Sequence, residues 1–162
     1  MNEIKKIGGQ VMKDLDLNSL EEIHVKALIN ELKYLENFIN ERKLQESVVS
    51  RINERQDVVS FRLGIKYFIV LKRGNIEKDR FSISLIFKDT HHVLVRIDVN
   101  GGIHKNPDGT TAPKSHIHIY SNTHEKKDRY VYKISPKDFP ELYNLYSAYH
   151  SFLAYNNIQS IK

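Results

Sequence analysis

The most regular pattern of hydrophobic and polar positions lies in residues 92–120. Hydrophobic residues alternate with polar ones on both sides of a loop that contains glycine and proline. Because side chains in a strand point alternately to opposite faces, each half predicts a β-strand with one apolar and one polar side. The polar positions all carry even numbers: Arg96, Asp98 and Asn100 in the first strand, and His116, His118 and Tyr120 in the second.

An antiparallel hairpin would bring the two polar sides together. The shared parity predicts three cross-strand pairs: Asn100 with His116, Asp98 with His118, and Arg96 with Tyr120. A solvated sheet face usually shows lysine, glutamate and threonine, whereas this surface combines acid, base and anion-binding groups. We therefore predict a functional site on it.

The surrounding pattern predicts helices and further strands. Apolar residues recur at intervals of three and four after Ser19 and Glu22, which have the spacing of a capping box, and this predicts a long helix from residue 19 to about residue 45. Short runs of β-branched and aromatic residues then predict a sheet. Its expected strands cover residues 58–63, 67–73, 81–88, 92–99, 115–121 and 129–135.

A second helix is expected near the end of the chain, opened by Asp138, Pro140 and Glu141. The order of helix, five or six antiparallel strands and helix predicts an α+β fold with both helices on the apolar face of the sheet. The polar face would remain open. We expect a loosely ordered segment over residues 1–17 and a single domain over residues 18–162.

Composition narrows the classes of protein. The absence of cysteine excludes disulfides, zinc–cysteine sites and thiol catalysis, and fits a reducing cytoplasm. No apolar run approaches the roughly 20 residues that span a bilayer, so no membrane association is expected. The net charge of +5 favours nucleic acid only modestly, and solubility alone explains it as well.

The predicted polar face suits cleavage of RNA without a metal. His116 and His118 would act as base and acid, and Arg96 would stabilise the charged phosphate. Asp98 would orient a histidine. The residues expected to contact a substrate or partner are Asn100, His104, Lys105, Asn106 and Tyr120. Two histidines spaced in this way also occur as ordinary exposed residues, which is the alternative without a function.

A divalent metal site is a second chemical option. His116 and His118 project from one face at a separation that suits chelation, with Asp98 or His104 as the third ligand. The segment Asn106-Pro107-Asp108-Gly109 has the residues of a turn and is expected to shape the loop.

Residues 92–135 resemble a family of small uncharacterised proteins encoded by phages and prophages. The similarity rests on RIDVNGG, on the HKNPDG loop and on the HIHIY strand. Arg96, Asp98, His116 and His118 also resemble, more faintly, the RelE-like ribonuclease toxins, small α+β proteins that cleave RNA from an open sheet face. Together the resemblances imply a phage-type protein in the cytoplasm of a bacterial host.

Three functions follow as hypotheses. The first is a metal-independent RNA phosphodiesterase, a toxin or defence-related endoribonuclease. The second is a non-enzymatic inhibitor of a bacterial defence system, similar to an anti-CRISPR protein, that binds a protein or nucleoprotein complex. The third is a structural subunit of a phage particle. The apolar stripe of the first helix is expected to pack on the sheet of the same chain, and a homodimer through this stripe is the alternative.

Overall fold

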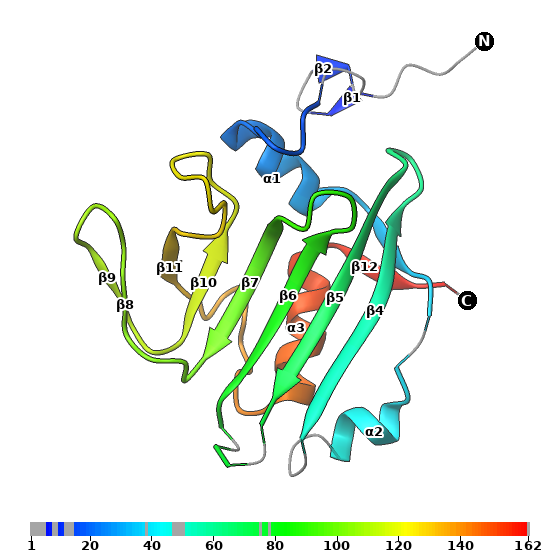
Figure 1. The fold of residues 1–162 in the computed structure, drawn as a ribbon. Helices are drawn as coiled ribbons and strands as arrows, with labels where there is room; N and C mark the ends of the chain where they lie inside the picture. Colours follow the sequence, from blue (N-terminus) through cyan, green and yellow to red (C-terminus); the bar gives the residue numbers. More distant parts are fainter. Residues whose placement is uncertain are drawn as a thin grey trace.

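A mostly antiparallel sheet forms the centre of the computed structural model, which describes residues 6–7, 10–11, 15–37, 39–46, 51–74, 76–77 and 79–161 (Figure 1). Over these residues the sheet has eight strands. Their order is β11 (Val131–Lys133), β10 (His116–Ile119), β7 (Val93–Val99), β6 (Phe81–Phe87), β5 (Ile65–Arg73), β4 (Ile52–Ser60), β3 (Lys33–Leu35) and β12 (Ile158–Ser160). All neighbours are antiparallel except β12, which runs parallel to β3.

The α+β class and the antiparallel sheet are confirmed, but the sheet is wider than the predicted five or six strands. The strands β3 and β12 account for the difference. Two short hairpins lie outside the sheet, β1 (Lys6–Ile7) with β2 (Gln10–Val11) and β8 (His104–Lys105) with β9 (Thr111–Ala112).

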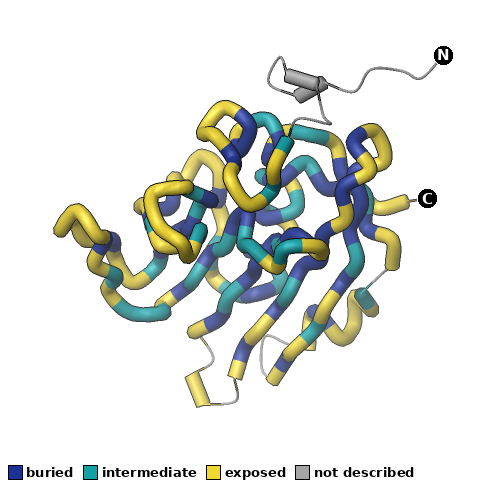
Figure 2. The backbone as a smooth tube through the Cα atoms, turned by 45° about the horizontal axis from the view of Figure 1, so that its top comes forward, coloured by how far each residue is buried: buried dark blue, intermediate teal, exposed yellow. Residues whose placement is uncertain are grey.

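The core lies between the sheet and the helices α1 (Glu22–Asn30) and α3 (Leu145–Tyr155), and α3 passes behind the sheet in Figure 1. Alternate strand residues such as Ile83 and Ile97 are fully buried and pack with Leu28 of α1 and Phe152 of α3. Figure 2 shows buried residues concentrated in the strands and exposed ones in the connecting loops. The apolar side of the sheet is thus covered, as the alternation predicts.

The prediction of a long N-terminal helix was wrong. Helix α1 ends at Asn30, β3 follows, and the short α2 (Glu41–Glu46) comes later. Lys33 is fully buried, and its ammonium group donates to the carbonyl oxygens of Ile29, Glu31 and Asn156 at 2.8–3.0 Å. These bonds satisfy carbonyls at the end of α1 and bind the segment to the C-terminal chain. Sheet pairing therefore overrides the helical spacing of the apolar residues.

Both predicted helix starts were also wrong. The N-cap of α1 is Glu21, whose side chain makes no capping hydrogen bond, so Ser19 and Glu22 form no capping box. Helix α3 begins after Asn144, whose side-chain oxygen accepts from the backbone N–H of Ser147 at 2.9 Å. Asparagine is a preferred N-cap residue.

Most of the predicted loosely ordered segment, residues 1–17, falls outside the described residues. No helix within the described ranges is long and apolar enough to cross a lipid bilayer.

Candidate functional site

The strands β7 and β10 pair in a register two residues away from the predicted one. His116 lies opposite Asp98, and His118 lies opposite Arg96. The pair Asn100–His116 does not form because Asn100 ends the strand with a φ of 55° and donates its backbone N–H to Ser115 Oγ. A shift of two residues preserves the side of every side chain. Arg96, Asp98, His116 and His118 therefore still meet on one face.

The two histidines of β10 are almost completely buried, with 3% of His116 and 2% of His118 exposed. Each donates from Nδ1 to a backbone carbonyl at 2.7 Å, His116 to Pro113 and His118 to Asp128. A carbonyl oxygen only accepts, so both Nδ1 atoms carry the hydrogen. The Nε2 atoms are left to face the centre of the site.

Both Nε2 atoms approach the same carboxylate oxygen. Oδ2 of Asp98 lies 3.0 Å from Nε2 of His118 and 3.4 Å from Nε2 of His116. Burial by itself raises the pKa of Asp98, but the hydrogen bond with His118 and the charge of Arg96 outweigh it and hold the pKa below its ordinary value. Asp98 is therefore a carboxylate at neutral pH and cannot donate a hydrogen to either histidine.

This arrangement favours a positive group beside the Nε2 atoms. A neutral imidazole with its hydrogen on Nδ1 presents a lone pair at Nε2, which a carboxylate oxygen repels. A second hydrogen on Nε2, as in imidazolium, would remove this repulsion, and so would a bound cation; at His118 the Arg96 guanidinium, 3.0 Å from Nε2, is a further positive donor. The ligand atoms of Asp98, His116 and His118 all lie within 4.8 Å of one another.

Arg96 and Asp128 frame the cluster on one side. Arg96 Nη1 lies 2.7 Å from Asp128 Oδ2, and its Nε lies 3.3 Å from Asp98 Oδ1. One guanidinium nitrogen also lies 3.0 Å from His118 Nε2. Asp128 is 5% exposed and serves twice, since its carboxylate binds Arg96 and its carbonyl binds His118.

His104 of β8 covers the two histidines. Its ring centroid lies 5.6 Å from that of His116 and 5.5 Å from that of His118. Burial lowers the pKa of His104, and the charge of His118 lowers it further. Its Nε2 is buried and has no hydrogen-bond partner among the described residues. A third imidazole thus borders the cluster, and its lowered pKa favours the neutral ring.

The other predicted contact residues have structural positions. Asn106 is buried and pairs with the backbone of Val131 through both its oxygen and its nitrogen at 2.9 Å, which fastens the β8–β9 hairpin to β11. The NPDG turn is confirmed, because the N–H of Gly109 donates to the Asn106 carbonyl and Gly109 has a φ of 89°. Asn100 donates from its side chain to the Asp79 carbonyl at 2.9 Å and belongs to the strand end.

Tyr120 and Lys105 do not join the cluster. Tyr120 is 3% exposed in the hydrophobic core, and its hydroxyl donates to the Leu17 carbonyl at 2.9 Å. A register irregularity between β6 and β7 buries both Leu94 and Val95, and Tyr120 follows this shift by donating its N–H to Leu94. Its predicted place opposite Arg96 was wrong. Lys105 is exposed on the hairpin.

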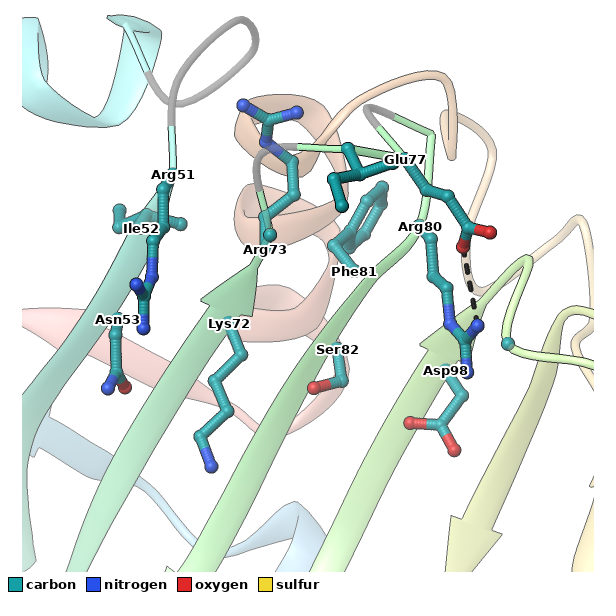
Figure 3. A pocket seen from close by; sticks show the side chains of 13 residues that line it. Arg51, Ile52, Asn53, Lys72, Arg73, Glu77, Arg80, Phe81, Ser82 and Asp98 are labelled. Atoms are coloured by element: carbon teal, nitrogen blue, oxygen red, sulfur yellow. Dashed lines mark hydrogen bonds and ion pairs between the residues drawn. The ribbon is translucent and has the colours of Figure 1, made fainter.

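A cleft that the sequence did not indicate opens beside Asp98 (Figure 3). Lys72 and Ser82 line it. The strand registers place Ser82 beside Asp98 and Lys72 one strand further away, although 26 residues separate positions 72 and 98 in the chain. No local pattern links these residues, since the sequences of their strands predict β-strands but no functional site. Asp128 was missed for the same reason: it lies between predicted strands among charged residues.

Comparison with curated proteins and with solved structures gives no match. A model of a family of unknown function, DUF6978, matches residues 20–158, a range that contains every residue of the cluster. The chain therefore belongs to the DUF6978 family.

Proposed function

We propose that Asp98, His116 and His118 bind a divalent transition-metal ion and that a water on this ion is the reactive group of the protein. The donor set is two imidazole nitrogens and one carboxylate oxygen, which suits zinc best among the common metals. Three protein ligands leave a fourth position for water, the usual arrangement in catalytic zinc sites.

The observation that carries the proposal is the geometry around Asp98 Oδ2. Tetrahedral zinc with bonds of about 2 Å keeps its ligand atoms about 3.3 Å apart. The distances from Oδ2 to the two Nε2 atoms, 3.0 and 3.4 Å, bracket that separation. Both histidines also donate Nδ1–H to backbone carbonyls, the usual support of metal-binding histidines.

Charge supports the same assignment. Histidines that bind a metal are neutral, and Arg96 then balances only one of the two carboxylates, Asp98 and Asp128, so one negative charge remains. An uncompensated negative charge in a partly buried cluster is costly, and a divalent cation would offset it. A bound metal would also remove the repulsion between Oδ2 and the Nε2 lone pairs.

Cleavage of RNA without a metal stays a prediction that the burial disfavours. A base and an acid must reach the 2′ hydroxyl and the leaving oxygen within hydrogen-bond distance. His116 and His118 are only 3% and 2% exposed, so neither presents a ring to a nucleic acid strand. Inhibition of a bacterial defence complex also stays a prediction, and no contact described above favours it.

The test is metal binding by the full chain. After dialysis against a chelator, the protein is titrated calorimetrically with zinc and, in parallel, with cobalt as a spectroscopic probe of tetrahedral coordination. We expect one ion per chain and a higher unfolding temperature with metal, because the ion binds the folded site. No stoichiometric binding of zinc or cobalt, with no change in unfolding temperature, would contradict the proposal.

A further inference from the structure

The cleft beside Asp98 has the size of a small-molecule site. Its volume is about 710 Å³, and it lies where the ends of β4, β5, β6 and β7 meet (Figure 3). Pockets that bind small molecules commonly measure about 300–1,000 Å³. Asp98 lines this cleft, whereas His116 and His118 do not. A ligand would therefore approach the proposed metal from the side of the carboxylate.

Among the described residues that line the cleft, basic side chains outnumber acidic ones. Its charged lining residues are Arg51, Lys72, Arg73, Arg80, Glu77 and Asp98. Glu77 is paired with Arg80, the nearest contact being 3.3 Å. The remaining acid is Asp98, which the proposed metal would neutralise. With that carboxylate neutralised, the exposed ammonium group of Lys72 favours an anionic ligand.

One row of cross-strand neighbours connects the cleft to the metal ligands. The strand registers place Asn53 beside Lys72, Lys72 beside Ser82, Ser82 beside Asp98, and Asp98 beside His116. Adjacent strands lie about 4.8 Å apart, so Lys72 and Asp98 are separated by about 10 Å at the backbone. The amide, ammonium and hydroxyl groups of Asn53, Lys72 and Ser82 are all hydrogen-bond donors.

We infer that this cleft binds the phosphate group of a phosphate ester of about nucleotide size, next to the metal. The inference rests on the proposed function and names its substrate class. A phosphate accepts several hydrogen bonds at once, which matches three donors from neighbouring strands better than a single carboxylate does. The phosphate ester is either a free nucleotide or the terminal phosphate of an RNA strand.

The chemistry that follows is hydrolysis of the ester. An ion held by Asp98, His116 and His118 would activate a water, whose oxygen would form a bond to phosphorus while the bond from phosphorus to the leaving oxygen breaks with its electron pair on that oxygen. A proton from the water ends on the leaving oxygen, so one water is consumed for each alcohol released. Lys72 would stabilise the charge on the phosphate.

The experiment measures phosphate binding by the zinc-treated full chain. Inorganic phosphate, adenosine monophosphate and a 5′-phosphorylated RNA oligonucleotide are titrated calorimetrically into the wild type and into Lys72→Gln. We expect the substitution to weaken inorganic phosphate binding about tenfold, the usual effect of losing one charge-assisted hydrogen bond. Tighter binding of the oligonucleotide identifies a strand end, and equal binding identifies a nucleotide; both support the inference.

Lys66→Gln is the matched control. Lys66 lies on the same strand and the same side as Lys72, is exposed, and does not line the cleft. It should leave phosphate affinity unchanged. Equal affinity in Lys72→Gln and the wild type, or no phosphate binding by the wild type, would overturn the inference. Zinc content is measured on the same samples, so phosphate binding that depends on Lys72 in a protein without zinc would overturn the metal proposal instead.

Discussion

The polar face of the sheet carries two regions that differ mainly in what covers them. On β4 and β5, Asn53 and Lys72 stand exposed to water. On β10, His116 continues the same row of neighbours but is 3% exposed, because His104 and the carbonyl of Pro113 pack against it. The first region can attract a charged ligand, whereas the second can fix the orientation of each nitrogen.

This difference in cover has an energetic consequence. Water screens an exposed lysine and competes for its hydrogen bonds, so the exposed region contributes little to stability. A buried polar group must find a partner within the protein. The two buried ring nitrogens that meet at Asp98 Oδ2 are therefore the basis of the proposed metal site.

The largest expected effect comes from removing the charge at the centre of the buried region. Asp98→Asn keeps the shape of the side chain but replaces a carboxylate oxygen by an amide. We expect zinc affinity to fall by at least about 100-fold, since changes outside the ligand shell already cost about 10- to 100-fold. Calorimetric titration of the folded variant measures the loss.

The control is Asp57→Asn, which makes the same change on the same face of the sheet but away from the cluster. Asp57 lies on β4 opposite Phe68 and is half-buried. The zinc affinity of this variant should equal that of the wild type. If Asp98→Asn bound zinc as tightly as Asp57→Asn, the buried region would not be a metal site.

A smaller effect is expected from Asp128→Asn, measured as the free energy of unfolding in denaturant without metal. Asp128 is buried and its carboxylate lies 2.7 Å from Arg96, so the substitution weakens a buried ion pair. We expect a loss of about 2 kcal/mol. Glu22→Gln removes the exposed pair with Lys26 and should cost less than about 1 kcal/mol. Equal losses would mean that burial adds nothing to the pair in the cluster.

The smallest expected effect is a pH dependence from Asp98 in the metal-free protein. The balance of burial, the His118 hydrogen bond and the Arg96 charge leaves the pKa of Asp98 in the folded chain below its ordinary value of 3.8. The contribution of Asp98 to stability is therefore complete above pH 3.8 and is lost as the pH falls from there through the folded-state pKa. The difference in unfolding free energy between the wild type and Asp98→Asn, measured from about pH 6 to about pH 3, should shrink as the pH falls below 3.8. Parallel curves would contradict this role.

The cluster was more predictable than the helices. Alternation alone placed Arg96, Asp98, His116 and His118 on one face, and the placement survived a register two residues away from the expected one. A strand has a period of two, so any even shift leaves the faces unchanged. The register itself depends on how Asn100 turns the chain, which alternation does not encode.

The prediction of one long first helix failed because it used the spacing of neighbouring residues, whereas β3 forms by pairing with distant strands. Leu32 and Leu35 continue the spacing of α1, yet β3 pairs with β4 on one side and with β12 on the other. Residues 158–160 are more than 120 positions away from that segment. Periodicity within a short window carries no information about such a partner.

The sequence by itself determined the alternation of the strands, the α+β class, the NPDG turn and the shared face of the four central residues, because each depends on neighbours in the chain. The tertiary structure decided what covers that face. It moved Tyr120 into the core, brought His104 and Asp128 against the histidines, and placed Lys72 in the row that leads to Asp98. Burial and long-range pairing depend on how distant segments pack, so the environment of these side chains became visible only in the fold.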